Sequence, residues 1–221
     1  MDLKNYLSFI LNLDKYVGII ITQYGAITYL ILFFLIFLET GLVITPFLPG
    51  DSLIFILGTF ASQQVINFWL LLIVLISAAI LGDSVNYFIG KNFGEKVFSK
   101  SGLYNQQYIE KTKEFYAKYG GKTIIYARFV PFVRTFAPFI AGIGHMKYRK
   151  FFIYNVIGGV LWVSLFLVAG YFFGAIPFVK QNLTLITFII IGLSLVPPLI
   201  EYLIEKRKRP KYLKITLNNQ Q

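Results

Sequence analysis

The sequence contains no cysteine, one histidine and unusually few charged residues. The lack of cysteine excludes disulfide bonds, thiolate metal sites and a cysteine nucleophile. Only 14% of the 221 residues are charged, whereas about 25% is usual for a soluble domain. We also find no nucleophile beside a base, no metal-binding cluster and no glycine-rich phosphate loop. The sequence therefore predicts neither an enzyme nor a protein with a metal or other cofactor.

Apolar residues, by contrast, are abundant and form long runs. They make up 57% of the chain, and the clearest runs are 66–82, 151–175 and 183–204. A helix needs about 20 such residues to cross the hydrocarbon core of a bilayer. We therefore predict an all-α polytopic membrane protein with a single membrane domain over residues 1–221. The net charge of +11 does not indicate a nucleic-acid partner, because the basic residues flank apolar runs, where topology and anionic lipids explain them.

The basic residues predict the topology. The C-terminal tail 205–221 is strongly basic, which is typical of a cytoplasmic segment. Counting back through the spans puts the turn 176–182 outside, and it puts both 145–150 and the lysine-rich segment 91–122 inside. We expect interfacial amphipathic helices in that lysine-rich segment. Residues 123–144 then begin and end on the same side, so they are predicted to form a re-entrant hairpin.

This hairpin combines bases, prolines and an apolar background. Arg128 and Arg134 lie in it together with Pro131, Pro138 and Gly142. Each proline removes a backbone donor and disfavours helix in the residue before it, which favours a bend. The glycine allows close backbone approach.

An earlier segment mirrors it with acids in place of bases. Residues 26–61 carry Glu39 and Asp51, and the same topology count lets them enter from the outer face. We therefore predict an inverted repeat with two opposed re-entrant hairpins, the first repeat covering about 5–90 and the second about 105–175. The hinge residues expected in the first hairpin are Gly41, Pro46, Pro49 and Gly50.

The four hairpin charges form the predicted site. A charge at the centre of a membrane helix costs about 2.5–3.5 kcal/mol, so we expect these groups to face one another in a polar cavity. Arginine suits phosphate, so Arg128 and Arg134 are predicted to bind a lipid phosphate. A carboxylate in a low-dielectric cavity binds a proton more readily than one in water, so Glu39 and Asp51 are predicted to exchange protons.

Other polar and aromatic residues receive structural interpretations. Asp83 and Asn86 are expected to cap a helix end or to form hydrogen bonds between helices, with a secondary part in the site. Trp69 and Trp162 are expected to be packing or interface residues.

Three segments together resemble the DedA family of bacterial inner-membrane proteins. They are ETG…PFLPGD at 39–51, GDSVNYFIGKNFG at 82–94 and RFVPFVRTFAPFIAGIGHM at 128–146. The resemblance implies opposed re-entrant hairpins and transport of lipids between leaflets, as in the wider superfamily of scramblases with the VTT domain. It also implies undecaprenyl phosphate or phosphatidylethanolamine as substrate and coupling to the proton gradient.

We therefore predict a flippase for a phosphate-bearing lipid in the cell envelope, multi-pass in the bacterial inner membrane, with membrane lipids and protons as partners. Two alternatives stay open at this point. One is a proton-driven antiporter of small cations or drugs, in which the same acids act and the arginines are their partners. The other is a non-transporting membrane-organising protein with static ion pairs. The sequence also leaves the oligomeric state open, with a homodimer as one alternative.

Overall fold

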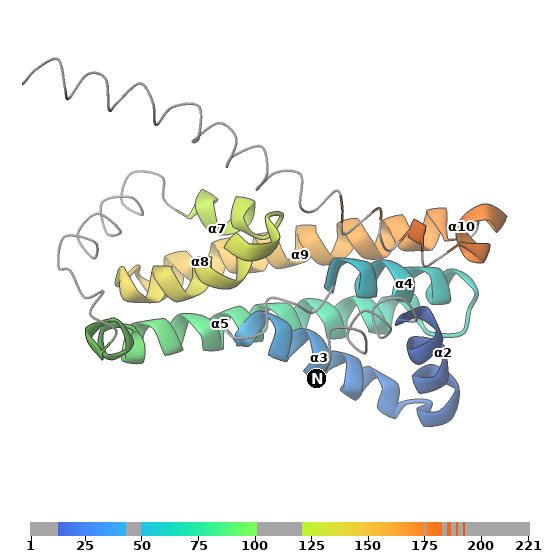
Figure 1. Ribbon diagram of the computed structural model, residues 1–221, viewed down its shortest axis with the longest axis horizontal. Coiled ribbons are helices and arrows are strands. Elements are labelled where there is room, and N and C mark those ends of the chain that lie inside the picture. Colours follow the sequence, from blue (N-terminus) through green and yellow to red (C-terminus); the bar gives the residue numbers. More distant parts are fainter. Residues whose placement is uncertain are drawn as a thin grey trace, which may run out of the picture.

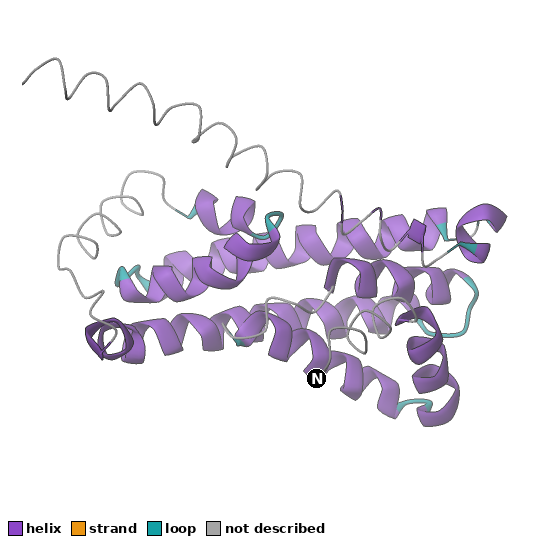
Figure 2. Ribbon diagram, viewed as in Figure 1, coloured by secondary structure: helices purple, strands orange, loops and turns teal. Residues whose placement is uncertain are grey.

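In the computed structural model, the described residues are 13–42, 50–100, 121–174 and 176–182, with 185, 186, 189 and 192 beyond them, and every regular element among them is a helix (Figures 1 and 2). The helices are α2 (Leu13–Tyr24), α3 (Ile27–Gly41), α4 (Gly50–Ser62), α5 (Phe68–Lys100), α7 (Lys122–Ala127), α8 (Pro131–Ile143), α9 (Tyr148–Phe173) and α10 (Pro177–Gln181). The all-helical prediction is confirmed for this part of the chain. The predicted span 183–204 and the basic tail lie largely outside it.

Two long helices, α5 and α9, run side by side along the long axis of the molecule (Figure 1). Their apolar stretches, Phe68–Gly94 and Tyr148–Phe173, are 27 and 26 residues long. At 1.5 Å per residue each is roughly 40 Å long, more than the about 30 Å of a hydrocarbon core. Their outward-facing side chains are large and apolar, which suits contact with lipid. Helix α5 continues through Asp83 and Asn86, so neither residue caps a helix end.

Shorter helices lie on this pair. Helices α3, α4 and α8 have 15, 13 and 13 residues, too short to cross a bilayer alone. Helix α3 packs on α5, α4 on α9, α7 on α9 and α8 on α5. In Figure 1, α8 lies to the left and α4 to the right, and their first residues meet near the middle of the molecule.

The breaks between helices follow from proline and glycine. Gly25 adopts a left-handed φ of 50° between α2 and α3, a conformation that glycine adopts readily. Val130 is extended, and Pro131 then opens α8, a position at which its missing donor is not needed. The bend predicted at Pro138 is absent, because α8 continues through it to Ile143. Pro46 and Pro49 lie outside the described residues.

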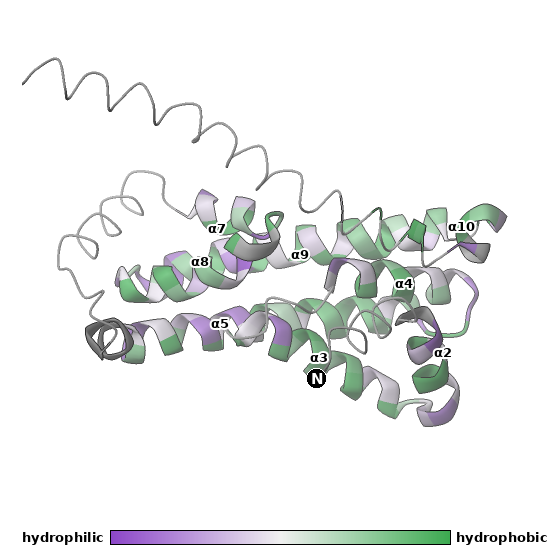
Figure 3. Cartoon of the chain, viewed as in Figure 1, coloured by the Kyte–Doolittle hydropathy of each residue, from purple (hydrophilic) through white to green (hydrophobic). Residues whose placement is uncertain are grey.

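Two apolar clusters leave a polar zone between them. The larger cluster joins α3, α4 and the first half of α5 to the second half of α9, and it includes Ile36, Leu57 and Leu75. The smaller one surrounds Tyr87 and Phe151 near the other end. Figure 3 shows hydrophilic residues on α5, on α8 and at the end of α3, within otherwise largely hydrophobic helices.

Candidate functional site

Arg134 lies where three short helices meet. It is in the first turn of α8, and its Nη1 donates to Asp51 Oδ1 over 2.7 Å. Its Nη2 donates to Glu39 Oε1. Glu39 is near the end of α3, and Asp51 is in the first turn of α4. One guanidinium therefore holds two carboxylates that precede and follow residues 43–49.

The local sequence explains this arrangement. The backbone N–H of Gly50 donates to Glu39 Oε1 over 3.2 Å, and a Cβ at Gly50 would overlap the Glu39 carboxylate. Only glycine leaves room for this contact. The N-terminus of α4 also favours the two nearby carboxylates through the helix dipole. Arg134, at the N-terminus of α8, is unfavourably placed by the same rule, and the carboxylates offset this.

Arg128 forms a second, separate cluster. Its Nη2 donates to Asp83 on α5 and, over 2.5 Å, to Asn155 Oδ1 on α9. The carbonyl of Ala79 lies 3.4 Å from the same nitrogen. The side chains of Arg128 and Asp83 are 4% and 5% exposed. Arg128, the residue after α7, is thus joined to α5 by an ion pair and to α9 by a hydrogen bond.

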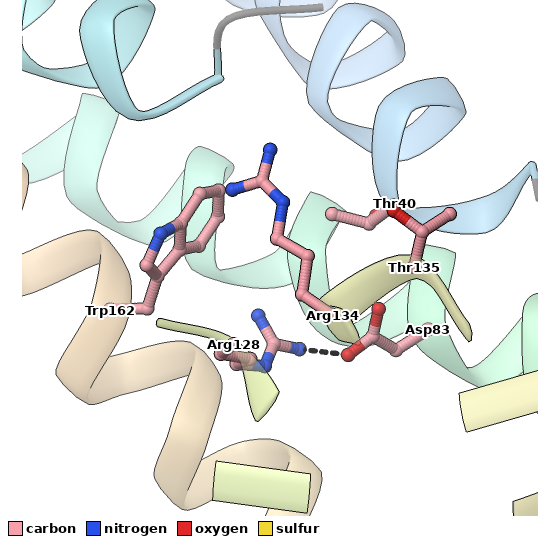
Figure 4. A pocket seen from close by; sticks show the side chains of 6 residues that line it. All are labelled: Thr40, Asp83, Arg128, Arg134, Thr135 and Trp162. Carbon is pink, nitrogen blue, oxygen red and sulfur yellow. Dashed lines mark hydrogen bonds and ion pairs between the residues drawn. The ribbon is translucent and has the colours of Figure 1, made fainter. Parts of the chain in front are cut away.

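Trp162 lies between the two clusters. The centre of its ring is 5.0 Å from Arg134 Cζ and 5.9 Å from Arg128 Cζ, within range of a cation–π interaction. Its indole N–H donates to Asp51 Oδ1 over 2.9 Å. Figure 4 shows Trp162 facing the Arg134 side chain across the site. The tryptophan therefore connects an acid of one cluster with the bases of both.

A small void lies among these groups. Its volume is about 10 Å³, room for about one water molecule. Several polar atoms of the site residues have no hydrogen-bond partner among the described residues, namely Glu39 Oε2, Asn86 Oδ1 and Arg128 Nε. The lining residues, drawn in Figure 4, are Thr40, Asp83, Arg128, Arg134, Thr135 and Trp162.

The charges of the two clusters do not balance. The ion pairs of the described residues join three carboxylates to two guanidinium groups, which leaves one negative charge in excess if all are ionised. An uncompensated buried charge is expensive, and a group in that position tends to become neutral. No group of three or more acidic or histidine side chains within the described part of the chain is arranged to hold a metal ion.

The structure brings together three of the four predicted site charges. Glu39, Asp51 and Arg134 meet as expected, but Arg128 pairs with Asp83 and not with either hairpin acid. Asp83, expected to be a cap or an interhelical bond, is therefore half of a buried ion pair.

Other predicted residues serve in helix packing. Asn86 Nδ2 donates to the carbonyls of Thr40 and Thr135, 3.2 and 2.7 Å away, and so ties α5 to α3 and α8. A Cβ at Gly41 would lie 3.3 Å from the backbone of α5, and one at Gly142 would overlap the backbone of the same helix. Both glycines permit close approach of helices.

Two residues of the site were missed from the sequence. Trp162 received only a packing role, and Asn155 was not singled out. Asn155 is a polar residue in the apolar run 151–175, and that was the one available signal.

Comparisons with known proteins agree on one group of relatives. A family model described as the VTT domain matches residues 48–172. Protein DedA of Escherichia coli K12 is 53% identical over 212 residues, which is 94% of this chain and 97% of that protein. An uncharacterized membrane protein of Mycobacterium leprae is 44% identical over 75% of each chain. Inner membrane protein YghB of Escherichia coli K12 is 35% identical over 71% of this chain and 73% of its own. No solved structure matches.

Proposed function

Because the chain belongs to the DedA family of membrane proteins, which share the VTT domain, we propose that it is a transporter that moves a phosphate-bearing lipid between the leaflets of the bacterial inner membrane. The substrate is undecaprenyl phosphate or a phospholipid such as phosphatidylethanolamine. Transport is coupled to protons, and no enzymatic step is involved. The lipid chain stays in the bilayer while the headgroup passes through the protein.

One observation carries this proposal. Arg134 presents both terminal nitrogens to two oxyanions, Glu39 and Asp51, at the place where the N-termini of α4 and α8 meet. A phosphate has the same charge sign as these carboxylates and also presents several acceptor oxygens, and the guanidinium fork suits both kinds of ligand. Helix N-termini favour the same ligand. The carboxylates therefore occupy the place that we assign to the phosphate.

Proton coupling follows from exchange at Arg134. When a phosphate replaces Glu39 and Asp51, the two acids lose their counter-ion in a buried site. They become neutral by taking up protons, because a buried carboxylate without a partner is costly. Oε2 of Glu39 has no hydrogen-bond partner in the part of the chain that the structure describes, and we assign the proton to it. Return of the acids to Arg134 then releases the protons and the phosphate.

The helix packing supports an inverted repeat. We pair α3, α4 and α5 with α7, α8 and α9. In each half, the middle helix packs on the long helix of the other half, α4 on α9 and α8 on α5, whereas α3 and α7 pack on the long helix of their own half. Glycines line both contacts, since a Cβ at Gly58 would meet Gly170 and one at Gly142 would meet Gly90. Such a plan, with its site at the centre, is common among transporters.

Topology completes the proposal. The short helices belong to re-entrant hairpins that enter from opposite faces, and the C-terminus is cytoplasmic. The turn after α4 lies at the same end of the molecule as α10, and the end of α5 lies at the same end as the turn before α9 (Figure 1). This arrangement fits the sides that the basic residues predict.

Reconstitution tests the function. The purified protein is placed in vesicles with labelled undecaprenyl phosphate, and a membrane-impermeant reagent scores the label on each leaflet. We expect lipid exchange that accelerates with a proton gradient and is lost in Arg134→Gln. A matched control is Arg149→Gln, an exposed arginine at the start of α9. Exchange that Arg134→Gln leaves intact, or cation flux without lipid movement, would contradict the proposal.

A further inference from the structure

The two arginines of the site have different surroundings. Arg128 is enclosed on several sides, since Asp83, Asn155 and the Ala79 carbonyl all lie at its Nη2. Its other edge lies against α9, where a Cβ at Gly158 would come within 3.0 Å of Arg128 Cδ and 3.3 Å of Arg128 Nε. A phosphate has no room at that edge. The glycine instead makes a slot for the arginine side chain.

The partners of Arg128 are themselves fixed. The Asn155 amide donates to the Ile80 carbonyl over 3.0 Å and to Ser84 Oγ over 3.4 Å, so its Oδ1 is held toward the guanidinium. Asp83 and Asn155 lie on the two long helices that form the centre of the molecule. A ligand that displaced either one would have to separate α7 from this pair.

Arg134 differs on each point. Its side chain is 12% exposed, against 4% for Arg128. Its partners are a carboxylate near the end of one short helix and a carboxylate at the start of another. Neither α3 nor α4 would have to leave its long helix for a carboxylate to swing away.

Arg128 is also placed to control Arg134. It directly follows α7, and only Phe129 and Val130 separate it from the proline that begins α8. Arg134 is in the first turn of that helix. The position of Arg128 therefore sets where α8 begins and where the Arg134 guanidinium lies.

On the basis of the proposed function, we propose that Arg134 alone contacts the lipid phosphate. Arg128, Asp83 and Asn155 form a cluster, called the clamp below, that holds the Arg134 side chain in position. Asp83, Asn155 and Gly158 are positioning residues of the transport site. The specificity for a phosphate thus belongs to one arginine, and the second arginine with its acid holds the start of α8 in place.

Two neutral pairs of variants test this division. Asp83→Asn with Arg128→Gln removes the clamp charges together, and Glu39→Gln with Arg134→Gln removes a matched ion pair from the other cluster. Replacing both members of the clamp pair leaves no lone charge, so that protein is expected to fold. In Glu39→Gln with Arg134→Gln, Asp51 loses Arg134 and keeps the indole N–H of Trp162 as donor, and the melting temperature checks that this variant is folded. Trp162 reports binding by its fluorescence in a Trp69→Phe background, because it faces both arginines and donates to Asp51.

Titration with undecaprenyl phosphate in nanodiscs gives the affinity of each variant. We expect the clamp pair to bind within about threefold of the parent protein, because both buried charges are removed together. We expect Glu39→Gln with Arg134→Gln to show no saturable change. Asp83→Asn alone leaves Arg128 without its acid, so Arg134 should be displaced from its position. This variant should bind the lipid roughly tenfold to a hundredfold more weakly than the parent protein. If the clamp only stabilised the fold, Asp83→Asn would lower the melting temperature and leave the lipid affinity of the folded protein unchanged.

The Gly158→Ala variant tests the clamp independently, in case the Asp83→Asn with Arg128→Gln protein does not fold. It keeps every charge and pushes only on the Arg128 side chain, so it should weaken binding without abolishing it. A folded clamp pair that fails to bind, or a Gly158→Ala protein with unchanged affinity, would overturn the proposal. If the parent protein responds neither to undecaprenyl phosphate nor to phosphatidylethanolamine, the proposed function fails. The clamp is then still judged by melting, where the pair must be more stable than either single variant.

Discussion

Arg128 and Arg134 are six residues apart, yet one is bound by long helices and the other by the ends of short ones. The partners of Arg128 are in the middle of α5 and in the first third of α9, the two long helices that run side by side along the molecule. The partners of Arg134 flank residues 43–49. We therefore assign a fixed contact to the Arg128 side chain and an exchangeable one to the Arg134 side chain.

This difference suggests what can change during transport. Breaking the Arg128 pair leaves a charge buried between helices, whereas Arg134 can lose one carboxylate and keep the other. A transport site needs an ion pair that opens at low cost beside one that does not.

The largest effect is expected from removing one acid of each cluster. Asp83→Ala leaves Arg128 buried and unpaired, which should lower the free energy of unfolding by about 3–5 kcal/mol. Asp51→Ala removes one ion pair of Arg134 and the acceptor of the Trp162 N–H but leaves Arg134 with Glu39, so it should lower the free energy of unfolding by about 1–2 kcal/mol. Denaturant unfolding of the purified proteins in detergent measures both values. Equal losses would show that the two clusters are alike.

An intermediate effect is expected at Gly50. A Cβ there would overlap the Glu39 carboxylate and push it from Arg134, so Gly50→Ala should cost about 1–3 kcal/mol of stability and impair lipid exchange. Gly18→Ala in α2 is the matched control, since its nearest neighbour is Phe60 at 3.4 Å. A Gly50→Ala protein that exchanges lipid at the parental rate would contradict the role of this contact.

The sequence predicted the general plan of the site for physical reasons that are visible locally. Arginines and acids in apolar runs are costly unless they meet, so the meeting of Glu39, Asp51 and Arg134 could be expected. A proline in an apolar run indicated the helix boundary at Pro131. The helical class followed from the length of the apolar runs.

The partner of Arg128 could not be predicted in the same way. Asp83 lies within a continuous helix, and the sequence alone does not say which face of α5 meets the residue after α7. Asn155 and Trp162 look like ordinary residues of an apolar span, because their roles depend on packing between segments far apart in the chain. Such contacts are set by the tertiary arrangement of helices and leave no local pattern.

The smallest effect is expected at Trp162. Phenylalanine keeps the aromatic ring beside the arginines but loses the N–H that donates to Asp51, so Trp162→Phe should lower stability by about 1 kcal/mol. It should also free Asp51 to leave Arg134, and lipid affinity should rise. Trp69→Phe, whose side chain is 70% exposed, should change neither quantity. Unfolding of both variants, and calorimetric titration with lipid, which needs no tryptophan reporter, decide this point.

The central claim is that a lipid phosphate replaces carboxylates at Arg134, and proton exchange on binding tests it most directly. Undecaprenyl phosphate is added to the protein in weakly buffered nanodiscs, and the pH change is recorded. The account predicts net proton uptake by the parent protein, tighter lipid binding at lower pH, and neither effect in Glu39→Gln with Asp51→Asn. Lipid binding without proton uptake, or equal uptake in the double variant, would contradict it.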